Sequence, residues 1–178
     1  MLNSEIRSKI LKERWLLPPP TKTKYDHTIY LKTLTFIKNK SIKNYIGLYW
    51  PIEGEVDTIA LIDELLRLKY RVCLPYIENK KMVYKQIKNT NFDCEFWKNM
   101  RQPLKSFLTI KPKQIDLLIV PLIAFNDSNH RLGYGLNFFN NYLIKNDTDA
   151  VGLAYSFQHT NNFKITNKDI SLKRIITN

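Results

Sequence analysis

The sequence predicts an α/β protein: a three-layer α/β/α domain built around a mostly parallel central sheet. Segments with helical spacing of apolar residues alternate with short apolar runs along the chain, as in repeated strand–helix units. The run Leu117–Phe125 is continuously apolar, which is typical of a strand buried on both faces of a sheet. The length of 178 residues suits one substantial core, so we expect residues 1–178 to form a single domain.

The first half of the chain contains most of the predicted helices. Apolar residues recur with helical spacing from Leu2 to Leu17, and the prolines at 18–20 are expected to stop that helix. In chain order the next expected elements are a helix over 25–37, a strand over 44–50, a helix over 58–68 and a buried strand over 71–74.

The second half supplies the remaining strands and one more helix. Asn89–Lys113 is the least periodic stretch and is expected to be a loop excursion. The other expected elements are strands over 81–86, 117–125, 151–155 and 174–177 and a helix over 138–144. Ligands of open parallel sheets bind beyond the carboxyl ends of the strands, so we expect the site near residues 50–55, 125–135 and 155–158.

Composition limits the location and the class of the protein. Hydrophobic residues make up 44% of the chain and aromatic residues 12%, which is typical of a folded protein. No apolar stretch reaches the ~18 residues that cross a bilayer, and the charged N-terminus does not resemble a signal peptide. We expect a cytoplasmic protein with no membrane partner. Cys73 and Cys94 lack a metal-ligand or disulfide spacing, so reduced structural thiols are expected.

The formal charge of +12 could attract nucleic acid, an anionic surface or small acidic ligands. The lysines are scattered, without an Arg-rich arm or a motif of stacking aromatics, so we expect no nucleic-acid partner. An RNA-binding module remains the third-ranked hypothesis. The chain is also rich in Lys, Asn and Ile, a bias that arises in A/T-rich genomes. On this interpretation many of the lysines are solvated surface residues with no binding partner.

One loop carries the strongest functional signal. A polar turn at 126–129 follows the apolar run, and then come Arg131, Gly133 and Gly135 before a helical stretch. Glycines let a backbone approach phosphate closely, a helix N-terminus offers free N–H groups, and an arginine adds a cation with two donors. The pattern is neither a Walker loop nor a dinucleotide fingerprint, and Gly-x-Gly alone is often a plain turn. It predicts a phosphate site, with Arg131 as its best ligand.

Four stretches of the chain together resemble a known family. The block at 115–143 reads IDLLIVPLIAFNDSNHRLGYGLNFFNNYL, and matching stretches lie at 5–14, 49–58 and 151–177. They resemble the 5-formyltetrahydrofolate cyclo-ligases, in which a strand ending in Pro-x-x-x-Phe precedes Arg-x-Gly-x-Gly-x-Gly-Tyr-Tyr-Asp. The resemblance covers nearly the whole chain. It implies an enzyme that binds 5-formyltetrahydrofolate and ATP with Mg²⁺, releases ADP, and is most simply a monomer.

The resemblance also implies roles for individual residues. The implied ATP-binding residues are Arg7, Arg131, Leu132, Gly133, Tyr134, Gly135, Leu136, Asn137, Phe138 and Phe139, with Arg131 also catalytic. Trp50 and Glu55 would hold the folate, since a carboxylate accepts from adjacent pterin N–H groups. Asp169 and Asn140 would lie near magnesium. From the residues alone, Glu55 could instead stabilise a helix dipole, and Asp169 could be a loop or capping residue.

The chain departs from the family pattern at several of these positions. Asn140 replaces a metal-associated aspartate, and an amide is a weaker Mg²⁺ ligand than a carboxylate. The other departures are Asn3 and Leu136 where lysine is frequent, Asn137 where glycine is usual, and Lys173 where an acidic residue is usual. Lys9 or Lys168 could supply compensating charge. The departures motivate a second hypothesis, a family member that binds folate or nucleotide without turnover.

Overall fold

The computed structural model describes residues 2–166 and 169–178. Its helices are α1 (Asn3–Leu16), α2 (Pro19–Lys38), α3 (Ile59–Arg67) and α4 (Phe138–Asn146), with 3-10 turns η1 (Pro112–Gln114) and η2 (Ser156–Gln158). Its strands are β1 (Tyr45–Gly47), β2 (Arg71–Glu78), β3 (Lys81–Ile87), β4 (Cys94–Trp97), β5 (Met100–Pro103), β6 (Thr109–Ile110), β7 (Ile115–Pro121), β8 (Ala124–Phe125), β9 (Arg131–Leu132), β10 (Ala150–Ala154) and β11 (Arg174–Thr177).

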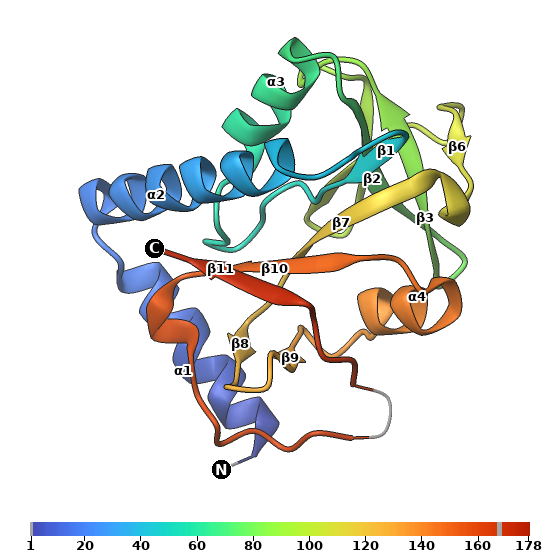
Figure 1. The fold of residues 1–178 in the computed structure, drawn as a ribbon. Helices are drawn as coiled ribbons and strands as arrows, with labels where there is room; N and C mark the ends of the chain where they lie inside the picture. Colours follow the sequence, from blue (N-terminus) through green and yellow to red (C-terminus); the bar gives the residue numbers. More distant parts are fainter. Residues whose placement is uncertain (1, 167–168) are drawn as a thin grey trace.

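A seven-stranded sheet in the order β11-β10-β7-β1-β2-β3-β6 forms the centre of the fold. The neighbours from β11 to β2 pair in parallel, and the β2–β3 and β3–β6 pairs are antiparallel. Helices α2 and α3 pack on one face and α4 on the other (Figure 1). The predicted α/β fold with a mostly parallel central sheet is confirmed. None of the helices in the described ranges has the length and apolarity of a membrane span.

The strand β7 shows why the apolar run is continuous. Leu117 and Ile119 belong to the core cluster beneath α2 and α3, whereas Leu118 and Val120 belong to the cluster beneath α4. All four side chains are fully buried. A third, smaller cluster joins α1 to the β8–β9 hairpin and Phe163, and it fixes α1 against the end of the sheet where the site forms (Figure 1).

The helix predicted over 25–37 starts six residues earlier in the structure. Helix α2 starts at Pro19, because Pro19 and Pro20 occupy the first turn, where no backbone N–H has a partner within the helix. The prolines end α1 as expected. They also begin the next helix, and the sequence analysis did not anticipate this second role.

The single strand expected over Leu117–Phe125 is also wrong. Strand β7 ends at Pro121, which pairs with Leu153, and the chain then turns away from the sheet. Ala124 and Phe125 form a separate hairpin with Arg131 and Leu132. The apolar run continues because residues 122–124 are buried under α1 and the C-terminal segment, so burial without strand pairing produced the same pattern.

The stretch 89–113 is more ordered than the expected loop. It contains the β4–β5 hairpin and the edge strand β6. Neither strand of this hairpin alternates regularly between apolar and polar residues, so the sequence shows no strand periodicity there. Lys98, with a φ of 55°, makes the hairpin turn. Strand β2 also runs four residues beyond the predicted Leu74, to Glu78.

Gly47, at the end of β1, leaves room for two core side chains of the same sheet, Leu118 on β7 and Tyr84 on β3. A Cβ there would lie 2.4 Å from Leu118 Cδ2 and 2.9 Å from Tyr84 Cε1. We expect Gly47→Ala to lower the free energy of unfolding by about 1–3 kcal/mol, because a packed core must shift to admit the methyl group. Urea denaturation measures the loss. The matched control is Gly133→Ala, whose nearest contact is the tip of the Arg131 side chain at 3.1 Å, and a smaller loss is expected there. Equal losses would contradict the packing argument.

Candidate active site

A cavity of about 650 Å³ lies beyond the carboxyl ends of β1 and β7. It is walled by the first turns of α1, the loop from β9 into α4, the β4–β5 turn and the segment before β11. Every residue predicted for the site lines it: Arg7, Trp50, Glu55, Arg131, Leu132, Gly133, Tyr134, Gly135, Leu136, Asn137, Phe138, Phe139, Asn140 and Asp169. The structure therefore brings together residues that are up to 162 positions apart in the chain.

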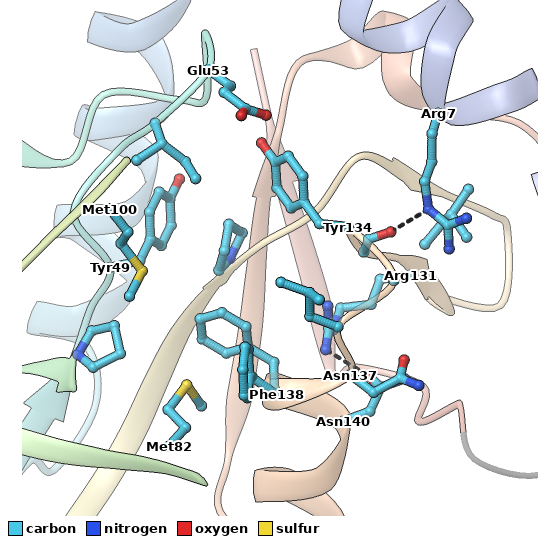
Figure 2. A pocket seen from close by; sticks show the side chains of 18 of the residues that line it. Arg7, Tyr49, Glu53, Met82, Met100, Arg131, Tyr134, Asn137, Phe138 and Asn140 are labelled. Atoms are coloured by element: carbon cyan, nitrogen blue, oxygen red, sulfur yellow. Dashed lines mark hydrogen bonds between the residues drawn. The ribbon is translucent and has the colours of Figure 1, made fainter. Parts of the chain in front are cut away.

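Arg131 is the central cation of one side of the cavity. Its side chain is 5% exposed, and its Nη2 donates to Asn140 Oδ1 at 2.5 Å (Figure 2). Burial lowers the pKa of the guanidinium to about 10, against the opposing effect of the Asp169 charge. The group therefore stays positively charged at neutral pH. Its Nε is buried without a hydrogen-bond partner among the described residues.

Asn140 and Asp169 connect Arg131 to the segment before β11. Asn140 Nδ2 donates to Asp169 Oδ1 at 2.9 Å, and the Thr166 backbone N–H and hydroxyl both donate to Asp169 Oδ2 at 2.8 Å. The amide of Asn140 therefore bridges a cation and a carboxylate. A carboxylate at position 140 could accept from Arg131 but could not donate to Asp169.

Arg7 approaches the same side of the cavity from α1. Its Nε donates to the Gly133 carbonyl oxygen at 2.7 Å (Figure 2). Gly135 has a φ of 92°, a conformation that L side chains rarely adopt, and a Cβ there would lie 3.8 Å from the Arg7 guanidinium. These contacts bring two arginines and the backbone of a glycine loop together, directly before the N-terminus of α4 at Phe138. The combination suits an anion such as phosphate.

Asn3, where the family often has lysine, ties α1 to the C-terminal segment. Its Nδ2 donates to the Lys164 carbonyl oxygen at 3.0 Å, and its Oδ1 accepts from the Lys164 backbone N–H at 2.8 Å. Both residues line the cavity. A lysine therefore reaches this rim from a different segment. Lys9 lies on the exposed surface of α1 near Glu13 and does not line the cavity, and Lys168 lies outside the described residues.

The opposite side of the cavity is apolar and aromatic. Figure 2 shows Tyr49, Met82 and Met100 across the cavity from Arg7, Arg131 and Asn140. Trp50 lies on this side, held edge-on by Phe92 at 5.3 Å between ring centroids and covered by the Arg101 guanidinium at 4.5 Å. The indole is thus fixed as a rigid wall, which suits a planar heterocycle.

The β4–β5 turn closes this side. The Trp97 ring meets Phe138 at the start of α4 edge-on, at 5.4 Å between centroids. Asn99 Nδ2 donates to Glu53 Oε1 at 2.9 Å, which joins the turn to the loop after β1. The residues of this turn were not predicted for the site, because they lie in the stretch that was expected to be a loop: Trp97, Lys98, Asn99 and Met100. Trp97 could have marked this stretch as part of the site, because a tryptophan in a polar, non-periodic segment is unusual for a solvent-exposed loop.

Glu55 is the buried carboxylate of the site. It is 4% exposed, and its Oε2 accepts from the Ile52 backbone N–H at 3.0 Å. Burial raises its pKa to about 7, while the Ile52 N–H and the Arg14 charge lower it. The alternative role for Glu55, stabilising the start of a helix, is not supported. Helix α3 begins four residues later, at Ile59, and the Ile59 backbone N–H donates to Asp57 instead.

Arg14 is a further residue of the site region that was not predicted, and it lies behind the cavity rather than in its lining. It is 4% exposed and donates through Nη1 to the Tyr134 hydroxyl at 3.0 Å, and through Nη2 to the Leu122 carbonyl oxygen. The sequence feature that could have identified Arg14 is its spacing from the buried residues of α1. Arg14 continues the buried stripe of Ile6 and Ile10 at intervals of four residues, and an arginine in such a stripe is rare without a specific partner.

The remaining departures from the family pattern lie in different places. Lys173 pairs with Asp149 and does not line the cavity. Leu136 lines the cavity and is 49% exposed, so the position is open to a ligand without offering a charge. Asn137 caps α4 in the left-handed conformation, with a φ of 55°, which explains why glycine suits the position and asparagine is tolerated.

The two residues predicted to lie near magnesium offer one carboxylate and one amide, Asp169 and Asn140. Within residues 2–166 and 169–178, no group of three or more His, Cys, Asp or Glu side chains could hold a metal. Asp169 offers the single carboxylate that Mg²⁺ often takes from a protein when phosphates supply the other ligands. Asn140 Oδ1 already accepts from the Arg131 guanidinium, so a metal bound there would share this oxygen with a cation. The magnesium assignment stays a prediction.

Comparisons with known proteins agree with this geometry. The sequence model of the 5-formyltetrahydrofolate cyclo-ligase family matches residues 2–178. A 5-formyltetrahydrofolate cyclo-ligase of Mycoplasma genitalium is 30% identical over 181 residues, covering 98% of this chain and 97% of that protein. One from Mycoplasma pneumoniae is 29% identical over 161 residues, covering 89% and 88%.

Solved structures give the same result. A 5,10-methenyltetrahydrofolate synthetase from Mycoplasma pneumoniae superposes with a TM-score of 0.82 at 27% identity, covering 98% of both chains. The synthetase of Aquifex aeolicus superposes with a TM-score of 0.87 at 26% identity, covering 99% of this chain and 89% of that one. Since the family's sequence model spans the described fold and the whole cavity, this chain belongs to the 5-formyltetrahydrofolate cyclo-ligase family.

Proposed function

We propose that this protein is an ATP-dependent ligase that converts 5-formyltetrahydrofolate to 5,10-methenyltetrahydrofolate, with release of ADP and phosphate. The observation that carries the proposal is the division of one cavity into two chemically different ends. One end has Arg7, Arg131 and the Gly133–Gly135 backbone, and the other has a rigid indole and a buried carboxylate. A reaction between a polyphosphate and a flat heterocycle needs both ends side by side.

The proposed chemistry asks the protein mainly to position two substrates. The N5-formyl oxygen attacks the γ-phosphorus of ATP, and the bond from that phosphorus to the ADP oxygen breaks. N10 then attacks the activated formyl carbon, and this new bond closes the ring. Loss of phosphate and of the N10 proton gives the 5,10-methenyl product. Phosphoryl transfer depends chiefly on alignment and on stabilising charge, which are the roles we assign to Arg131 and Arg7. Glu55 and Trp50 would orient the pterin.

Magnesium enters the proposal as the ion that accompanies ATP. When bound, it would neutralise charge on the phosphates, with Asp169 as its protein ligand. The sequence also leads us to expect a monomeric, cytoplasmic enzyme. Both expectations are part of the proposal.

The test follows one reaction with two signals. Purified protein, 5-formyltetrahydrofolate and MgATP are mixed, and the near-ultraviolet absorbance of the methenyl product is recorded alongside ADP release. ATP-dependent product with matching ADP is the expected result. A folded protein that binds 5-formyltetrahydrofolate and forms no product would overturn the proposal in favour of a binding-only family member.

The bridging role of Asn140 leads to a separate prediction. Asn140→Asp removes the donor to Asp169 and places two carboxylates together, so the metal-free protein should unfold about 1–3 kcal/mol more easily. A divalent cation between the carboxylates should reverse this loss. Urea denaturation in EDTA and in excess Mg²⁺ measures both effects.

Asn137→Asp is the matched control for that experiment. It makes the same substitution at the start of α4, at a residue for which no contact with Asp169 is found among the described hydrogen bonds. Stability that depends on Mg²⁺ is expected for the variant at position 140 alone. Metal-independent stability of both variants would contradict the bridging argument.

A further inference from the structure

Arg14 is a buried cation that the proposed chemistry does not use. A guanidinium removed from water costs several kcal/mol unless its partners compensate, so its position calls for an explanation. Among the described residues, its side chain donates to the Tyr134 hydroxyl and to the Leu122 carbonyl oxygen. Leu122 follows β7 and Tyr134 precedes α4, so Arg14 joins α1 to two segments that meet at the cavity.

The loop that carries Glu55 rests on the same arginine. Gly54 has a φ of 69°, and a Cβ there would lie 3.3 Å from Arg14 Cβ. The backbone of this loop therefore passes directly over the Arg14 side chain. The Arg14 guanidinium thus contacts Tyr134, and the aliphatic part of its side chain lies against the Glu55 loop.

The groups that face Glu55 come from several elements. Glu53 lies in the same loop, and Figure 2 shows its carboxylate close to the Tyr134 hydroxyl. Tyr49 follows β1, and Tyr155, after β10, donates through its hydroxyl to the Glu55 backbone carbonyl oxygen at 3.3 Å.

Arg14 supplies the positive charge in this group. Burial and the Glu53 charge raise the pKa of the Glu55 carboxyl, whereas the Arg14 charge and the Tyr134 hydroxyl both lower it. Without Arg14, burial and the Glu53 charge would act on Glu55 with less opposition.

We propose that Arg14 is the positioning residue of the cavity end that holds Trp50 and Glu55. It keeps Tyr134 and the Glu55 loop in one arrangement, so that the Glu55 carboxylate lies where the pterin is proposed to bind. Both oxygens of the ionised carboxylate can accept hydrogen bonds from neighbouring pterin N–H groups. In the protonated form one of these oxygens carries a proton and acts as a donor. This inference rests on the proposed function, since it assigns the pterin to Glu55.

The test measures binding of 5-formyltetrahydrofolate, without ATP, from pH 6 to 9. Trp50 and Trp97 line the cavity, so quenching of tryptophan fluorescence reports binding. The variants are Arg14→Gln, which keeps N–H donors and loses the charge, and Arg14→Lys, which keeps the charge. ADP affinity, measured in parallel, shows that each variant is folded.

In the wild type, affinity should fall as the pH drops through about 7, where Glu55 gains its proton. Arg14→Gln should move that midpoint up by about one pH unit, which makes binding about fivefold weaker at pH 7. Arg14→Lys should return the midpoint toward the wild-type value. ADP affinity should stay within about twofold in both variants.

An unmoved midpoint in Arg14→Gln, or a lysine variant that behaves like the glutamine variant, overturns the inference alone. A wild type that binds no 5-formyltetrahydrofolate overturns the proposed function and the inference with it. If the glutamine variant does not fold, Tyr134→Phe provides the second test. It removes the hydroxyl that Arg14 contacts, and a midpoint raised in the same direction is expected.

Discussion

Replacing Arg131 by alanine is expected to lower kcat/KM for methenyl product formation by about 100- to 1,000-fold. The guanidinium lies in a buried environment where charge on a transferring phosphoryl group is poorly screened, so its loss removes stabilisation that water cannot replace. Asn140 and Asp169 also lose their cation, and a fall in unfolding free energy of about 1–3 kcal/mol should accompany the kinetic loss.

Two further variants separate the role of this arginine from general charge. Arg131→Lys keeps the charge without the planar pair of donors, and it should recover part of the activity. Lys173→Ala removes a cation that pairs with Asp149 outside the cavity, and it should leave turnover unchanged. If a folded Arg131→Ala enzyme turns over within tenfold of the wild type, Arg131 does not hold the reacting phosphate.

The sequence was most informative where a local pattern and its purpose coincide. A fully buried strand, then an arginine and two glycines before a helix, predicted an anion-binding loop. The structure places Arg131, Gly133 and Gly135 at the cavity, and the binding of an anion there stays a prediction. The resemblance then added Arg7 and Asp169. Their approach to Arg131 depends on how α1 and the C-terminal segment pack, and no local pattern contains that information.

The rest could not be predicted, for physical reasons that differ from place to place. Strand β7 and the chain after it are equally apolar because both are buried, so composition could not show that strand pairing ends at Pro121. The β4–β5 hairpin is half-exposed and lacks alternation, so its contribution of Trp97 to the cavity left no periodic trace. Arg14 was overlooked because helical spacing was judged from apolar residues alone.

Glu55→Gln is expected to stabilise the protein at pH 8 by about 3 kcal/mol relative to the wild type. Burial raises the pKa of Glu55 from its ordinary 4.5 to about 7, so the folded state binds a proton that the unfolded state has released between those pH values. The wild type therefore loses stability as the pH rises from about 4.5 to about 7. Glutamine has no proton to lose, so the difference between the two proteins should vanish near pH 4 and be complete above pH 8.

Urea denaturation of both proteins across this pH range isolates the effect, because all other titrating groups contribute equally and cancel in the difference. Glu53→Gln removes a charge from the same loop at a half-buried position, and a smaller change is expected there. The stabilised Glu55→Gln protein should bind 5-formyltetrahydrofolate about 10- to 100-fold more weakly, since its amide cannot accept from both pterin donors. A gain in stability together with this loss of binding would show that the cost of burying Glu55 is tied to substrate recognition. A variant that binds folate as tightly as the wild type would separate the two and leave the buried carboxylate without the role proposed here.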